Sequence, residues 1–261
     1  MSKKHKTAPV TSGFETALNK YVDGYALADH PELCPELFNR LGLDGYYTFF
    51  VEHGYNKKPG TYHGLTHSLQ TALNCYEGGL YAHLNNSELK TVVVAGLYHD
   101  ARHSQGMHSD RFNVQEAIRT LETAHTFTPE HQRLKKDELT ACIDAIKLTE
   151  YPYKAKKTSS TLGRVLRDAD MMALYTSDPD DLLDLFLGLI NEINLGLARS
   201  HMGGHDYADM SIDAFCEQQA RFVTGLEWNT SWGKLKAFTR NWPQAGRRLN
   251  HLLQLAKQQQ K

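Results

Sequence analysis

Cysteine is scarce in this sequence: there are 4 cysteines in 261 residues, and no two of them form a Cys-x-x-Cys pair. This spacing argues against a zinc ribbon and against a thioredoxin-type redox motif. No apolar run approaches the ~20 residues that span a bilayer, so we expect no membrane partner. A secretory signal is not recognisable either, and we therefore expect a cytoplasmic protein with reduced thiols.

An excess of charge of either sign is also lacking. Lys and Arg number 29 against 30 for Asp and Glu, which gives a formal net charge of −1. Such a balance creates no basic field of the kind that attracts nucleic acid, so we expect no nucleic-acid partner. The lysines at 154–157, with Arg164 and Arg167, are expected to form a solvated face. The sequence leaves the oligomeric state open.

Strand-like alternation of useful length is absent as well, whereas apolar residues recur at helical spacing through most of the chain. The sequence therefore predicts one all-α domain over residues 1–261, a helical bundle or array of about ten helices. We expect a core at about 60–175, C-terminal helices at 178–257 packed on it, and frayed tails at 1–12 and 257–261. The core helices are expected at about 63–84, 87–100, 113–124 and 128–148, the last with Thr128 as N-cap and Pro129 after it.

The most informative stretch is an apolar run that ends in polar residues. Val92 to Leu97 would carry the chain into the interior, and His99, Asp100 and His103 follow. A buried imidazole beside a buried carboxylate is costly unless a positive charge lies between them. A divalent metal ion supplies that charge and turns both groups into ligands.

Two further segments supply residues of the same kind. His63 and His67 are four apart, so on a helix both would lie on one face, with Cβ atoms ~5–6 Å apart. Asp168 and Asp170 follow later in the chain, and either carboxylate could complete the site. A mixed nitrogen and oxygen site suits one or two divalent ions, and the sequence does not distinguish Zn, Mn, Fe and Mg.

The order His, His-Asp, Asp resembles the HD superfamily of metal-dependent phosphohydrolases. Within it, the motifs are most similar to those of the cyclic-nucleotide phosphodiesterases, whose pattern runs Tyr-His-Asn-x-x-His-Ala, His-Asp-x-x-His-Pro-Gly and Ala-Asp. The counterparts here are Tyr62-His63-Gly64-Leu65-Thr66-His67-Ser68, His99-Asp100-Ala101-Arg102-His103-Ser104-Gln105-Gly106 and Ala169-Asp170. The likeness covers about 60–175 and departs at Gly64, Ser68 and Ser104-Gln105. It implies an all-α HD-type domain.

The resemblance also implies roles for the metal-site residues. The first metal would be held by His67, His99, Asp100 and Asp170, with Asp100 bridging to any second ion. Asp170 is preferred to Asp168 because its Ala-Asp dipeptide matches the family pattern at the head of an apolar helix, whereas Asp168 could cap that helix. A metal-bound hydroxide would then attack phosphorus.

Other residues are expected to assist. The resemblance makes His63 the general acid for the departing alkoxide, and His103 a residue that holds the nucleophilic water or a phosphate oxygen. Glu116 would hydrogen-bond metal waters, as a similarly placed Glu does in the family. Further candidates for substrate contact or support of the site are Tyr62, Arg111 and Gln218, the last from a Phe-x-x-Gln match at Phe215.

The predicted function is therefore hydrolysis of a nucleotide phosphoester, of the cyclic-nucleotide phosphodiester type, with a small-molecule nucleotide as partner. An HD-type 5′-nucleotidase or deoxynucleoside triphosphate triphosphohydrolase is the first alternative. An HD-fold di-iron oxygenase, which uses the same ligand set, is the second. A nucleotide-sensing module with a vestigial site is a non-enzymatic third.

Overall fold

The computed structural model describes residues 27–55, 57, 61–105, 107–151, 158–172, 188–189, 191–192 and 226–239. Within these ranges the regular structure is entirely helical, with eight α-helices and short 3-10 and π turns. The predicted all-α class is confirmed for this part of the chain. The tails at 1–12 and 257–261, and most of the helices expected at 178–257, lie outside the described residues.

The described elements follow one another in a simple order. Two 3-10 turns, η1 (Leu27–Asp29) and η2 (Pro31–Leu33), lead into the first described α-helix. The α-helices are α2 (Cys34–Leu41), α3 (Asp44–Phe49), α4 (Leu65–Tyr81), α5 (Asn86–Tyr98), α6 (Asp110–Phe127), α7 (Lys136–Lys147), α8 (Thr161–Met172) and α11 (Ser231–Thr239). A π-helical turn, η3 (Phe50–Gly54), follows α3, and a 3-10 turn, η4 (Glu130–Gln132), precedes α7.

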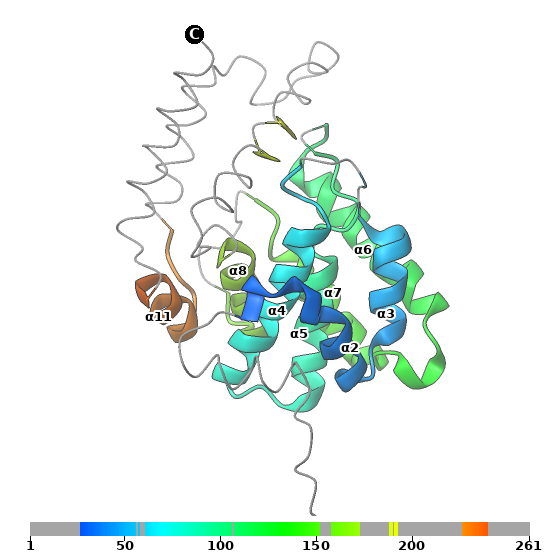
Figure 1. Cartoon of the computed structure of the whole chain (residues 1–261), viewed down its shortest axis with the longest axis horizontal. Coiled ribbons are helices and arrows are strands. Elements are labelled where there is room, and N and C mark those ends of the chain that lie inside the picture. The colour runs from blue at the N-terminus through cyan, green and yellow to red at the C-terminus, as the bar shows by residue number, and fades with distance from the viewer. Residues whose placement is uncertain are drawn as a thin grey trace, which may run out of the picture.

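Helices α4, α5 and α8 contact one another pairwise and form the centre of the molecule (Figure 1). Helix α5 starts with a capping box: Oδ1 of Asn85 accepts from the backbone N–H of Glu88, whose carboxylate accepts from the backbone N–H of Asn85. Its residues 91–98 are all buried, as the apolar run predicts. Such a helix has no solvent-facing side and must be surrounded by other elements.

A glycine lets α4 and α5 approach closely. A Cβ on Gly96 would lie 2.8 Å from Sγ of Cys75 and 3.0 Å from the backbone oxygen of Thr71, both on α4. Any larger residue would separate the two helices by displacing backbone, which cannot move aside as a flexible side chain does. Because His67 lies one turn before Thr71 and His99 lies three residues after Gly96, this contact brings the two imidazoles together.

The helix predicted at 128–148 is wrong in its first half, because α7 begins only at Lys136. Thr128 lies in extended conformation and ends α6, with its hydroxyl donating to the carbonyl of Ala124. The guanidinium of Arg133 then donates to the carbonyls of Thr126 and Thr128, which holds the connection in a turn. The bond to Thr128 engages the carbonyl that a helix beginning at this residue would use first.

No helix among the described residues is both long enough and apolar enough to cross a membrane. The cysteines at positions 34, 75 and 142 are buried and unpaired by disulfides. Burial raises the pKa of each of these thiols, so they remain protonated and unreactive. This agrees with the prediction of reduced thiols for the cysteines that the structure describes.

Candidate metal centre

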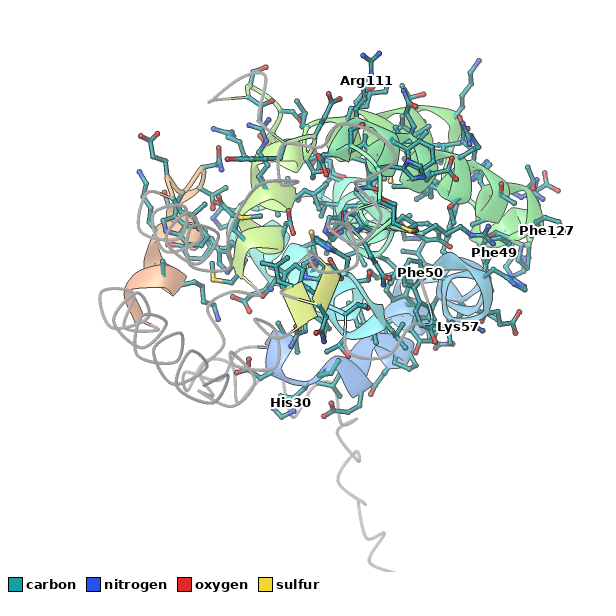
Figure 2. All side chains as sticks on the ribbon, turned by 90° about the horizontal axis from the view of Figure 1, so that it is seen from above. His30, Phe49, Phe50, Lys57, Arg111 and Phe127 are labelled. Atoms are coloured by element: carbon teal, nitrogen blue, oxygen red, sulfur yellow. The ribbon has the colours of Figure 1, made fainter. Side chains whose placement is uncertain are left out.

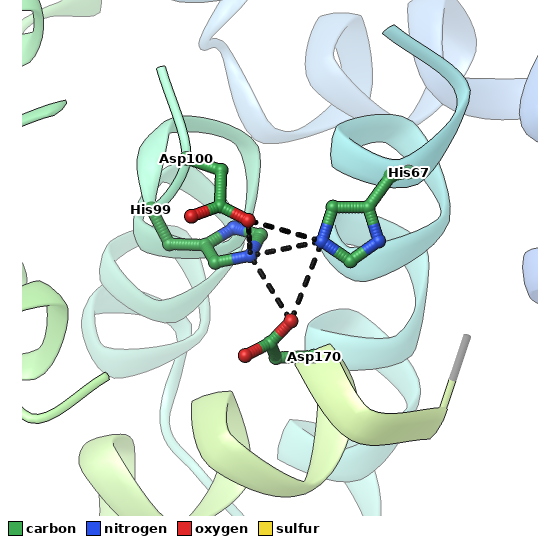
Figure 3. Close-up of side chains that lie close together, drawn as sticks. All are labelled: His67, His99, Asp100 and Asp170. Atoms are coloured by element: carbon green, nitrogen blue, oxygen red, sulfur yellow. Dashed lines mark hydrogen bonds and ion pairs between the residues drawn. The ribbon is translucent and has the colours of Figure 1, made fainter. Parts of the chain in front are cut away.

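Four of the predicted ligands converge at one point (Figure 3). His67 comes from the first turn of α4, His99 ends α5, Asp100 follows it, and Asp170 lies in the last turn of α8. The two Nε2 atoms of His67 and His99 face each other at 3.2 Å. Oδ2 of Asp100 lies 3.2 and 3.0 Å from these two nitrogens, and Oδ1 of Asp170 lies 3.3 Å from each.

This arrangement fits a divalent cation. The Nδ1–H of His99 donates to the carbonyl of Gly96 at 2.8 Å, which points its Nε2 at the two carboxylates. One donor atom from each of the four residues lies within 4.8 Å of the others, and the imidazoles are buried. Two neutral imidazoles and two carboxylates are a donor set that zinc, manganese and iron(II) accept. The cluster of His67, His99, Asp100 and Asp170, called the ligand cluster below, could therefore hold a metal ion.

The charges in the ligand cluster require a positive partner. Burial lowers the pKa of His99, but Asp100 and Asp170 raise it well above its usual value. The same pairing overcomes burial at Asp170 and lowers its pKa to about 2. Burial raises the pKa of Asp100, but His99 and His63 outweigh this effect and lower it well below its usual value. The two carboxylates therefore stay ionised, and without a metal a proton on His99 balances part of their charge. A cation bound at this point would replace that proton.

Asp168 makes its hydrogen bonds outside the ligand cluster, so Asp170 is the carboxylate of this pair that lies in the cluster. Its Oδ1 accepts from the backbone and side-chain N–H groups of Asn229, and its Oδ2 accepts from the backbone N–H and hydroxyl of Thr230. Thr230 in turn caps α11, because its hydroxyl accepts from the N–H of Gly233. Asp168 therefore fixes the start of α11 against α8 instead of capping its own helix.

Two local expectations about the ligand segments are wrong. Asp170 lies two residues before the last residue of α8, not at the head of a helix, because α8 begins as early as Thr161. His63 does not share a helix face with His67, since α4 starts at Leu65 after an extended Gly64. The backbone N–H of His63 donates to a carboxylate elsewhere in the chain.

That carboxylate belongs to Glu192. Its Oε1 accepts from the backbone N–H of His63 at 2.8 Å, and its Oε2 accepts from Nδ1–H of the same residue at 2.6 Å. The Nε2 of His63 lies 3.8 Å from Oδ2 of Asp100, on the side of the ligand cluster. Burial lowers the pKa of His63, but Glu192 and Asp100 outweigh this effect and raise it to about 9. Without a metal at Asp100, His63 is thus protonated at neutral pH.

His103 stacks on His63 but differs from it in protonation. The two ring centroids are 3.7 Å apart, with 28° between the planes. Nδ1 of His103 accepts from the backbone N–H of Gln105 at 3.1 Å, and its Nε2 contacts the side-chain amide of Asn113 at 2.8 Å. Burial and the neighbouring His63 lower the pKa of His103 to about 3, so this ring is neutral. His63, Asp100 and His103 form a second group whose possible ligand atoms lie within 4.8 Å of one another.

The other predicted residues are placed less centrally. Tyr62 is buried, with its ring centroid 4.7 Å from that of His63 and 4.6 Å from that of His67, so it packs beside the site. Glu116 pairs with Arg119 on α6. Arg111 is exposed and points away from the ribbon in Figure 2. Gln218 lies outside the described residues. Roles for Glu116, Arg111 and Gln218 remain predictions.

Glu192 is the residue of this site that the sequence did not indicate. It lies in the apolar run Leu187-Gly188-Leu189-Ile190-Asn191-Glu192-Ile193, where a carboxylate is unusual. An isolated acidic residue in such a run could have signalled a buried partner. The partner is 129 positions away, so local pattern does not identify it.

The described part of the chain thus presents an all-α protein with a buried histidine and aspartate cluster that could bind a metal ion. No protein-family model matches the chain, and no curated protein matches it either. The function is therefore inferred from the chemistry of the site.

Proposed function

We propose that the protein is a metal-dependent phosphohydrolase of the HD superfamily that hydrolyses a nucleotide phosphoester of the cyclic-nucleotide phosphodiester type. One observation carries the proposal: the imidazole of His63, held by Glu192, lies with its Nε2 3.8 Å from Oδ2 of Asp100, beside a buried set of four side chains that could hold a metal ion. Cleavage of a phosphoester needs positive charge at the phosphoryl oxygens and a proton for the departing oxygen. The site can supply both.

In this proposal the metal ligands, Glu192 and His63 have separate roles. A divalent ion, when bound by the four ligands, would lower the pKa of a bound water from ~15.7 toward ~7 and polarise the phosphoryl group. Glu192 holds the Nδ1–H of His63, which fixes the ring with its Nε2 on the side of Asp100. His63 would donate the Nε2 proton to the leaving alkoxide. This is general acid catalysis, which contributes typically ~10²–10⁴-fold to a rate.

His103 has a supporting role in this proposal. Both of its ring nitrogens already contact Gln105 and Asn113, and its face covers the face of His63. This geometry favours support of His63 by stacking over the direct contact with water or phosphate that the family resemblance implies. A nucleotide substrate would also agree with the expected cytoplasmic location.

The test is product analysis with the full-length chain loaded with Zn²⁺ or Mn²⁺. The substrates are 3′,5′-cyclic nucleotides, nucleoside 5′-monophosphates and deoxynucleoside triphosphates, in water enriched in ¹⁸O. We expect ring opening of a cyclic nucleotide, with the label in the phosphate, because attack occurs at phosphorus. His99→Ala should be inactive, and His63→Gln should be slowed by ~10²–10⁴-fold, the usual range for loss of a general acid.

The alternatives give different results in the same experiment. Activity on monophosphates or triphosphates alone would replace the phosphodiesterase proposal with the nucleotidase or triphosphohydrolase reaction. Oxygen consumption with bound iron and no phosphoester cleavage would support the di-iron oxygenase. A folded, metal-loaded wild type that is inactive on every substrate, and equal to His99→Ala, would refute the enzymatic proposal.

A further inference from the structure

Glu192 reaches His63 from a helical segment that lies unusually close to the chain before α4. Residues 188, 189, 191 and 192 are helical, and within this segment Gly188 and Glu192 are buried whereas 189 and 191 are not. Residues four apart on a helix share a face. Gly188 and Glu192 therefore belong to one face, one turn apart, and this face lies against residues 61–63.

The contact at Gly188 leaves no room for a side chain. A Cβ at this position would lie 2.8 Å from the backbone nitrogen of Tyr62 and 3.0 Å from the carbonyl carbon of Thr61. Ordinary van der Waals contact begins at 3.4 Å, so an alanine would have to move away by 3.4 − 2.8 = 0.6 Å. The neighbouring atoms are backbone, not the end of a flexible side chain, so the helix itself must shift.

A shift of this size would break the hydrogen bonds between Glu192 and His63. Glu192 makes two bonds to this one residue, at 2.8 Å to the backbone N–H and 2.6 Å to Nδ1. Lengthening both by about 0.6 Å would take them to or beyond the ~3.2 Å limit of a normal hydrogen bond. Residues 61–63 are also tied to the chain after α5, because Nε2–H of Gln105 donates to the hydroxyl of Thr61 at 2.9 Å. Residues 61–63 therefore cannot simply follow the displaced helix.

We propose that Gly188 is a positioning residue for His63: the absence of a side chain lets the helix of Glu192 lie on the Thr61–Tyr62 backbone, so that Glu192 reaches the backbone N–H and the Nδ1–H of His63. The inference rests on the proposed function only where catalysis is the readout. Gly188 touches no reacting atom and acts through Glu192.

The first test measures the hydrogen bond itself and needs no activity. In full-length protein labelled with ¹⁵N-histidine, the Nδ1 proton of His63 should give a downfield proton resonance, identified by its absence in His63→Gln. We expect the resonance to disappear or move upfield in Gly188→Ala and in Glu192→Ala. The matched control is Gly79→Ala, since Gly79 is also a buried helical glycine. A Cβ at Gly79 would lie 2.6 Å from its nearest neighbour, but that neighbour is the end of the flexible Leu89 side chain. Gly79→Ala should keep the resonance.

The second test uses the metal-loaded enzyme and the substrate it hydrolyses. Gly188→Ala should lower kcat by about 10- to 100-fold with KM changed less than about 2-fold, since misplacing a catalytic group by about 1 Å can cost ~10²-fold. In the Glu192→Ala background, Gly188→Ala should cause no further loss, because its effect passes through the removed carboxylate. Losses that multiply in the double variant would overturn the proposal.

The two tests separate the failure of this inference from that of the proposed function. A wild type inactive on every phosphoester, with the resonance lost in Gly188→Ala, would refute the function and support the positioning role. An unchanged resonance in folded Gly188→Ala would overturn the positioning role whatever the activity. If Gly188→Ala does not fold, Glu192→Asp shortens the reach by one methylene without disturbing the Gly188 contact; it should lose the resonance, and retention would overturn the inference.

Discussion

Asp168 and Asp170 lie two positions apart, and alanine substitutions should separate their roles. Oδ1 of Asp170 lies 3.3 Å from the Nε2 atoms of both His67 and His99, so Asp170→Ala removes one of four ligands. Loss of a residue that merely supports a metal ligand typically weakens metal binding by ~10–100-fold. We therefore expect Asp170→Ala to weaken binding by more than about 100-fold, and the variant to remain folded.

Asp168→Ala should have the reverse effect. It removes the acceptor of four hydrogen bonds, which come from Asn229 and Thr230 at 2.7–2.9 Å. At about 1 kcal/mol net for each bond, less part of the cost of burying the carboxylate, the change in unfolding free energy is about 3 kcal/mol. For a chain of this size, each kcal/mol lowers Tm by ~2–4 °C, so we expect a decrease of about 6–12 °C. Metal affinity should remain near that of the wild type.

Two measurements decide the matter. Metal affinity is determined by competition with a fluorescent zinc chelator at a temperature where both variants are folded, and Tm is determined in EDTA, so that metal does not contribute to stability. The corresponding asparagine variants serve as controls of similar size. If Asp168→Ala loses the metal and Asp170→Ala keeps it, the assignment of the ligand cluster is wrong.

Three further predictions concern charge and metal. Zn²⁺ or Mn²⁺ at 100 times its Kd should raise Tm by about 5–11 °C, since such binding stabilises by ~2.7 kcal/mol; a scan that metal does not alter, or that EDTA does not reverse, would contradict this. Burial lowers the pKa of His99, but Asp100 and Asp170 raise it well above normal, so a metal ion must displace a proton from this ring. Metal affinity should therefore fall as pH falls, and calorimetry in two buffers should detect proton release. Glu192→Gln removes a carboxylate that raises the pKa of His63, and His63 must be protonated to act as the acid. The decrease of kcat on the alkaline side of the pH profile should therefore begin at a lower pH than in the wild type. An unchanged pH profile would refute the role.

Part of the ligand cluster could be predicted from a local signal, whereas the choice of Asp170 rested on the family resemblance. The run from Val92 to Leu97 predicts a buried helix, and the polar pair His99-Asp100 at its end has no explanation in packing alone. The structure places both residues as expected. The local pattern did not predict the residue at which α4 starts. Spacing alone allows a helix that starts at His63. In the structure Gly64 is extended, and α4 therefore starts at Leu65.

The supporting contacts could not be predicted because they join distant segments. Glu192 bonds to His63 across 129 positions, and Asp168 bonds to Asn229 across 61. Periodicity describes which side of a helix is apolar, but it does not say which other segment that side meets. The same limit explains the error at Thr128. Its side chain suits an N-cap, and only the guanidinium of Arg133, bonded to its carbonyl, shows that the turn is preferred.

The charge state of His63 also bears on how many ions the site holds. At the group of His63, Asp100 and His103, a second ion could bind His63 only by displacing the Nε2 proton that the proposed general acid donates, and both nitrogens of His103 already contact Gln105 and Asn113. If His63 keeps that proton, any second ion would contact these three residues through Asp100 alone. We therefore expect His63→Gln to bind as many ions per chain as the wild type, measured by mass spectrometry after desalting at neutral pH. A loss of one ion in His63→Gln would show that His63 is a ligand, and it would then be a metal-bound imidazole with no proton to donate.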